Sequence, residues 1–221
     1  MFKMVGPPTP LTEMNAVQRD GLRLYKVSDD KWYPSVTTVT GHRKKDSILK
    51  WRKRVGEKEA NRISSLATNR GNRYHSMVEC YLKNETVEFD DSHPLSTFLF
   101  KSSKKVLDRI NNIHLLESPL YSDYLRVAGR VDCIAEYDGE LAVIDFKTAT
   151  REKKESWIEN YFVQETAYAV MYYERCGVKV DKIVTLIAIE DGATQVIQKY
   201  DLDYYHTLLK EYINEFMNLS K

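Results

Sequence analysis

The chain has 221 residues, 43% of them hydrophobic, so we expect one domain with a full core. A net charge of +1 does not indicate a nucleic-acid binder, and three widely spaced cysteines argue against a zinc finger or an iron–sulfur cluster. There is no apolar run of about 18 residues and no secretory leader, which predicts a cytoplasmic protein, in the host cytoplasm if a phage encodes it, with no membrane partner.

Hydrophobic periods and turn signals predict the elements in chain order. Residues 1–20 contain several prolines and are expected to form a flexible tail. Residues 21–112 are expected to hold a hairpin and then three helices, at 22–40, 46–55, 57–83 and 94–112. The helix at 57–83 could be interrupted at residues 68–71.

The middle of the chain changes to the two-residue period of strands. Residues 113–200 are predicted to form a core sheet with a crossover helix, with strands at 113–121, 125–137, 141–148, 182–190 and 193–200 and the helix at 154–176. A last helix, at 201–219, belongs to the C-terminal part, 201–221. This order predicts an α/β fold in which helices flank a central mixed β-sheet and an N-terminal helical region precedes it. The crossover helix permits one parallel strand pair.

Two acids and a lysine occupy strand positions where core residues are usual. Asp145 and Lys147 are two residues apart, so their side chains share a face. The two-residue Asp138-Gly139 turn places Asp132 opposite Asp145. Opposed carboxylates repel unless a cation lies between them, and hard oxygen ligands suit Mg²⁺ or Mn²⁺. Lys147 would then adjoin the metal and orient water or stabilise the charge of a phosphate.

A simpler interpretation puts these residues on a solvated sheet face, with Lys147 in a surface salt bridge. The apolar run 141–144 favours the metal site instead, because it indicates a strand that is buried on both faces. Charged residues at the end of such a strand are unfavourable unless they are used or paired.

The motifs, taken together, resemble one family of nucleases. GRVD followed by IDFKT resembles the signature of the PD-(D/E)XK nucleases in its RecB-like form, and the other matching stretches are RGNRYHSMVE (70–79), QETAY (164–168), WYPSVTTV (32–39) and the stretch 49–57. The last two stretches, 32–39 and 49–57, are similar to the N-terminal region of the branch that contains the mitochondrial genome maintenance exonuclease and its phage relatives. The resemblance implies the PD-(D/E)XK nuclease fold.

The resemblance also implies roles for individual residues. His75, Asp132, Asp145 and the backbone carbonyl of Phe146 would hold one or two Mg²⁺ or Mn²⁺ ions. Lys147 would act with the two aspartates, and Gln164 and Tyr168, which share a helix face, would hold the lysine, water or DNA. For each of these the plain alternative is structural: a half-exposed helix histidine, an exposed glutamine and a tyrosine packed in the core.

Two further acids have open roles. Glu79 lies one turn after His75, where it could hydrogen-bond the imidazole or simply be a solvated helix acid. Glu117 matches an acid that precedes the G-x-x-D strand in the family, and its alternative is a solvated strand edge.

A basic stretch at 42–54 is the predicted DNA contact, since it combines cations with an aromatic side chain. The alternative is a solvated helix whose buried side is formed by Ile48, Leu49 and Trp51. Ser35 and Thr37 could bind phosphate or belong to an ordinary turn. The predicted DNA-binding residues are Ser35, Thr37, Lys44, Lys45, Lys50, Trp51, Arg52, Arg54 and Arg70.

These expectations combine into a metal-dependent DNA exonuclease. The substrate would be single-stranded DNA with a free end, and the enzyme would act as a monomer, with a recombination or single-strand-binding protein as a further partner. The pathway implied by the resemblance is phage-type recombination, repair or DNA maturation. Two alternatives stay open: an endonuclease on the same fold, restriction or structure-specific, and a non-catalytic nucleic-acid-binding module. The absence of G-x-x-x-x-G-K-[ST] and of G-x-S-x-G argues against an ATP-driven motor and a serine hydrolase.

Overall fold

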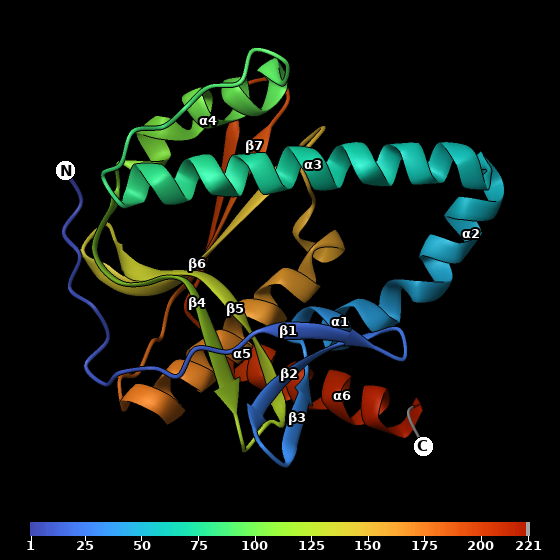
Figure 1. Cartoon of the computed structure of the whole chain (residues 1–221), viewed down its shortest axis with the longest axis vertical. Coiled ribbons are helices and arrows are strands. Elements are labelled where there is room, and N and C mark those ends of the chain that lie inside the picture. The colour runs from blue at the N-terminus through green and yellow to red at the C-terminus, as the bar shows by residue number, and fades with distance from the viewer. Residues whose placement is uncertain (220–221) are drawn as a thin grey trace.

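A five-stranded mixed sheet forms the centre of the computed structural model, which describes residues 1–219 (Figure 1). Its strands are neighbours in sequence order: β4 (Ile110–Ser122), β5 (Val127–Tyr137), β6 (Glu140–Ala149), β7 (Ile183–Ile189) and β8 (Thr194–Lys199). β6 and β7 pair in parallel, whereas the other neighbours pair antiparallel. The helix α5 (Glu159–Cys176) is the crossover that makes the parallel pair possible.

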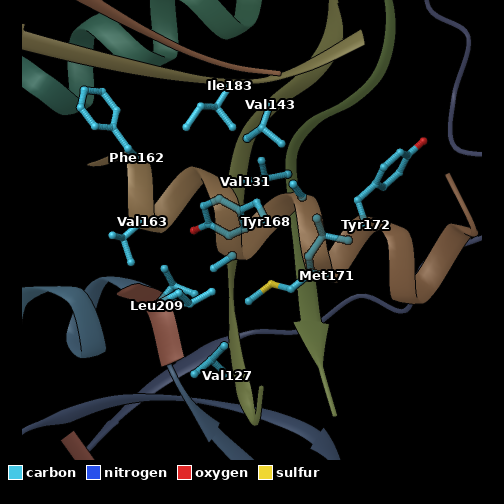
Figure 2. Close-up of a cluster of buried hydrophobic side chains, with 14 of the residues drawn as sticks. Val127, Val131, Val143, Phe162, Val163, Tyr168, Met171, Tyr172, Ile183 and Leu209 are labelled. Atoms are coloured by element: carbon cyan, nitrogen blue, oxygen red, sulfur yellow. The ribbon is translucent and has the colours of Figure 1, made fainter. Parts of the chain in front are cut away.

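Helices cover both faces of this sheet. α3 (Glu57–Leu82) and α4 (Pro94–Leu107) lie on one face, while α5 covers the other and packs against α1 (Val36–Gly41) and α6 (Leu202–Leu219). The buried strands supply apolar side chains to both layers by alternation. Figure 2 shows Val143 and Ile183 on the α5 side, and the next residues, Ile144 and Val184, belong to the core under α3 and α4.

A small antiparallel sheet precedes the helices. It consists of β1 (Ala16–Arg19), β2 (Leu22–Ser28) and β3 (Lys31–Pro34). The hairpin predicted at 22–40 is therefore confirmed only to Pro34, and residues 36–41 form a helix instead. The reason is a helix cap, because the Ser35 hydroxyl accepts a hydrogen bond from the backbone N–H of Thr38 at 3.0 Å.

One other predicted boundary was wrong, and the possible interruption of a helix did not occur. The helix expected at 94–112 ends at Leu107, since Ile110 already pairs with Tyr137 in the sheet. α3 continues without a break through residues 68–71. The last two residues of the predicted C-terminal part, 220–221, lie outside the described residues.

The N-terminal residues do not form the tail that was expected. The backbone N–H of Val5 donates to the carbonyl of Ile113, and the N–H of Ile113 donates to the carbonyl of Lys3, both at 2.8 Å. The first residues thus pair at Ile113 with β4, an outer strand of the five-stranded sheet, and bind its free backbone groups there. Met14 is buried and residues 16–19 form β1.

α2 (Lys45–Val55) and the first half of α3, to residue 69, form a helical arm that extends from the body of the chain (Figure 1). α2 contains no buried residue, so the interpretation of 48–51 as a buried helix face was wrong. Ile48, Leu49 and Leu66 are each at least 47% exposed. Within residues 1–219 no helix has the length and apolar character to cross a membrane.

Candidate active site

Three carboxylates lie on three adjacent strands at one position across the sheet. In the β5–β6 ladder Cys133 pairs with Ile144, so the next step brings Asp132 beside Asp145, as predicted from the Asp138-Gly139 turn. The regular ladder stops there, and the N–H of Phe146 donates to the Asp132 carboxylate at 2.9 Å.

The third carboxylate comes from β4. Leu116 pairs with Cys133 and Ser118 with Val131, which leaves Glu117 facing Asp132. Glu117 has a φ of 45°, in the left-handed region that non-glycine residues rarely occupy. Such an irregularity at a charged position is common in functional sites, because surrounding packing must hold it.

His75, on α3, completes a group of three that could bind a cation. Its Nδ1 lies 3.5 Å from Glu117 Oε1 and 3.7 Å from Asp132 Oδ2. One ligand atom from each of the three residues lies within 4.8 Å of the others. Two carboxylates and one imidazole fit a divalent cation such as Mg²⁺ or Mn²⁺.

The electrostatics of His75 show that this position attracts positive charge. Burial lowers the pKa of the imidazole, but Asp132 and Glu117 outweigh burial and raise this pKa to about 9. Without a metal the protonated imidazole therefore neutralises part of the negative charge. A metal that binds here must displace this proton, because only the neutral imidazole is a ligand.

Asp145 is not part of this three-residue group, although it was predicted to be a metal ligand. It is only 2% exposed, and its Oδ2 forms an ion pair with Lys147 Nζ. Its Oδ1 accepts a hydrogen bond from Gln164 Nε2 on α5 at 3.1 Å. Burial raises the pKa of Asp145 to about 6, although Lys147 opposes this shift.

Lys147 lies between the acidic cluster and the aromatic ring of Tyr161. Burial lowers its pKa, but the carboxylates of Asp145 and Asp132 outweigh burial and raise it. The ammonium group is 5.2 Å from the centre of the Tyr161 ring. The lysine is thus held protonated beside the carboxylates.

Tyr168 explains why a glycine begins the GRVD motif. A Cβ on Gly129 would lie 2.6 Å from the Tyr168 hydroxyl oxygen and 2.8 Å from Cε1 of its ring. Tyr168, which belongs to α5, is 3% exposed and packs among the core residues of Figure 2. The G-x-x-D and Q-x-x-x-Y stretches therefore contact each other directly, and the contact sets the position of β5 just before Asp132.

One buried acid near the site was missed from the sequence. Glu165, beside Gln164 on α5, has no exposed surface, and its Oε1 accepts a hydrogen bond from the Thr185 hydroxyl at 2.5 Å. Burial, followed by the charge of Asp145, raises the pKa of Glu165 well above its ordinary value. In the sequence, Glu165 could have been noticed as an acid within a helix whose neighbours are core residues. It was instead treated only as part of the Q-x-x-x-Y motif.

The remaining predicted residues fall into different environments. Arg70 contacts Glu190 and donates to Thr148 Oγ1 at 3.1 Å, so it ties α3 to the ends of β6 and β7, and its DNA contact stays a prediction. Glu79 pairs with Lys83 at 2.6 Å, and within residues 1–219 it forms no hydrogen bond or ion pair with His75, which favours the structural alternative. The carbonyl of Phe146 stays a prediction.

Only some side chains of the basic stretch and of Ser35 and Thr37 are exposed and available to bind DNA. Ser35 is 1% exposed and its hydroxyl caps α1, so the predicted phosphate contact was wrong for this residue. Arg52 pairs with Glu57 and donates to Asn61 at 2.6 Å. The residues that stay exposed are Thr37, Lys45, Lys50 and Arg54, and Lys44 and Trp51 are half-buried.

Comparison with known proteins defines the family. The family model described as the PD-(D/E)XK nuclease superfamily matches residues 37–215, so this chain belongs to that superfamily and its predicted fold class is confirmed. Over 174 residues the chain is 30% identical to human mitochondrial genome maintenance exonuclease 1, an alignment that covers 72% of this chain and 50% of the relative. The mouse protein of the same name is 29% identical over 156 residues, or 66% of this chain and 45% of the relative.

The chain thus spans about half the length of the curated relatives it matches. A crystal structure of an exonuclease candidate from Eubacterium rectale aligns with a TM-score of 0.43 at 14% identity, covering 66% of this chain and 64% of the other.

Proposed function

We propose that this chain is a metal-dependent DNA exonuclease that hydrolyses phosphodiester bonds at the ends of single-stranded DNA. The observation that carries the proposal is the convergence of His75, Glu117 and Asp132, with the Asp145–Lys147 pair beside them. Family membership supports nuclease chemistry, and relatives that are named exonucleases support action at ends.

The roles of the residues follow from their positions. His75, Glu117 and Asp132 would hold the cation, which when bound polarises a phosphoryl oxygen and lowers the pKa of a nearby water. Lys147 brings a protonated amine to the same place, where it can stabilise the negative charge that develops on the phosphate. Gln164 holds the Asp145 carboxylate, and Asp145 in turn fixes the lysine.

The preference for single strands is supported by the helical arm. The arm carries exposed cations, among them Lys45, Lys50 and Arg54, together with the exposed apolar side chains of Ile48 and Leu49. Cations contact the backbone of any nucleic acid, whereas exposed apolar side chains can in addition pack against the unstacked bases of a single strand.

The test is cleavage of linear and circular single strands of one sequence, each incubated with Mn²⁺ or Mg²⁺. We expect cleavage of the linear strand alone, and an end label then gives the polarity. The Lys147→Ala variant should lose this activity, whereas Lys105→Ala, which removes an exposed lysine from α4, should keep it.

Cleavage of the circle would replace the proposal with an endonuclease. Binding of DNA without cleavage in either metal would support a non-catalytic module. A linear duplex of the same sequence, cut as fast as the single strand, would contradict the strand preference.

A further inference from the structure

Lys44, which comes from a distant part of the chain, lies against the same aromatic ring as Lys147. Lys44 directly precedes α2, and its ammonium group lies 5.6 Å from the centre of the Tyr161 ring. Lys147 contacts the same ring at 5.2 Å. The two ammonium groups are therefore within about 11 Å of each other, since both lie against one ring.

Neutral oxygen atoms hold Lys44 in this place. Its Nζ donates to the backbone carbonyl of Trp157 at 3.1 Å and to Asn160 Oδ1 at 2.5 Å. An ammonium group has three donors, so one donor is left for another acceptor. Both acceptors are uncharged, and the positive charge of Lys44 is therefore not compensated.

Lys153 is a second cation, and its charge acts on Lys44. Its backbone is fixed against β8, because its N–H donates to Gln195 Oε1 at 3.1 Å and its carbonyl accepts from Gln195 Nε2 at 2.8 Å. Within residues 1–219 neither Lys44 nor Lys153 forms an ion pair with a carboxylate.

An anion would stabilise this arrangement. Burial, followed by the charge of Lys153, lowers the pKa of Lys44, so the loss of water and the neighbouring cation both disfavour its charged form. A bound anion would remove this repulsion. The site lies next to Lys147, where the proposed function requires a DNA backbone, so a phosphate is the anion that this position meets.

We propose that Lys44 and Lys153 together bind one backbone phosphate of the substrate strand, close to the scissile phosphate. This inference rests on the proposed function. The ammonium groups of Lys44 and Lys147 lie against one ring, so the bound phosphate would be within a few nucleotides of the scissile bond. The pair would hold the strand in register while Lys147 acts.

The experiment uses single strands that each contain one uncharged methylphosphonate at a defined position. An exonuclease that removes nucleotides from the end will stall when the modified group reaches a place that requires charge. We expect the wild-type chain to stall at two positions, once at the scissile site and once where the modified group reaches the lysine pair. Cleavage should slow by about tenfold at the second position, as for loss of one hydrogen bond to a charged group.

The Lys44→Ala/Lys153→Ala variant should cut unmodified DNA about tenfold more slowly and lose the second stall, while it keeps the first. Lys105→Ala is the matched control and should keep both. Replacement of both lysines by arginine should restore the second stall, which separates a lost charge from a damaged fold. Stalling of equal strength at both positions in the double variant would overturn the inference.

Failure of the proposed function gives a different result. If the wild-type chain cuts no DNA under any condition, the nuclease proposal fails, and binding still tests the lysine pair. The slope of log affinity against log salt should be about 0.7 smaller in the double variant, as expected for one phosphate contact in a single strand. An unchanged slope would overturn the inference without reference to catalysis.

Discussion

The contact between Gly129 and Tyr168 makes a strong prediction, because the space for a side chain at Gly129 is already filled. In the Gly129→Ala variant the new methyl group would meet three atoms of the Tyr168 side chain at 2.6 to 3.1 Å. Tyr168 is 3% exposed, so its ring has no free path into solvent. Either the ring or β5 must move, and Asp132 lies only three residues further along that strand.

The size of the effect follows from the cost of overpacking a core, about 1–3 kcal/mol for an added methylene. For a chain of this length that loss lowers the melting temperature by roughly 2–12 °C. Nuclease activity should fall more than stability, because a shift of about 1 Å at a catalytic group can reduce the rate about a hundredfold.

Thermal unfolding without metal measures the loss of stability in the Gly129→Ala variant. The matched control is Gly71→Ala, since nothing lies within 4 Å of a Cβ at this helical position. That variant should gain about 0.5–1 kcal/mol of stability, because alanine favours a helix interior. Tyr168→Leu, added to Gly129→Ala, should be less destabilising than the sum of the two single changes. A Gly129→Ala protein as stable and as active as the wild type would refute the reasoning.

Three further predictions concern the surroundings of the site. Arg70→Ala should cost about 1–3 kcal/mol and reduce cleavage, because it frees the α3 segment that carries His75; unfolding and activity are measured together. Ser35→Ala should cost about 1 kcal/mol through loss of the α1 cap, with unchanged DNA affinity in a binding titration. Glu165→Gln should stabilise the metal-free chain at pH 8 and have little effect near pH 4, measured by denaturant unfolding at both values.

The sign of the Glu165 prediction comes from its raised pKa in the folded chain. Such an acid contributes stability that is present below the pKa of the unfolded chain, about 4.3, and is lost as pH rises towards the folded value. Glutamine keeps the neutral form at every pH, so the benefit should appear only at high pH. A benefit of equal size at both pH values would mean that packing, rather than charge, explains the change.

Local patterns predicted the part of the site that lies within one hairpin. The Asp138-Gly139 turn fixed the register of β5 and β6, so Asp132 and Asp145 could be placed together before the structure was known. The β1–β2 turn has the same Asp-Gly pair, at Asp20-Gly21. The residue runs on either side of it are too short and too polar to indicate strands.

Partners that come from distant segments could not be predicted in this way. Glu117 faces Asp132 because of the register of β4, which depends on the longer connection before β5. Gln164 reaches Asp145 because α5 packs on the sheet, and this contact between distant segments does not follow from local patterns. Arg70 was predicted to contact DNA, and the partner that it contacts in the structure, Glu190, is 120 residues away and could not be predicted from local patterns.

The most direct test of the account follows Mn²⁺ in two ways, by calorimetric binding and by cleavage of an end-labelled single strand. The account predicts no cleavage in a chelator, cleavage that appears as Mn²⁺ binds, and loss of both in a folded Asp132→Asn variant. Cleavage in the chelator, or an Asp132→Asn protein that binds Mn²⁺ and cuts DNA like the wild type, would contradict it.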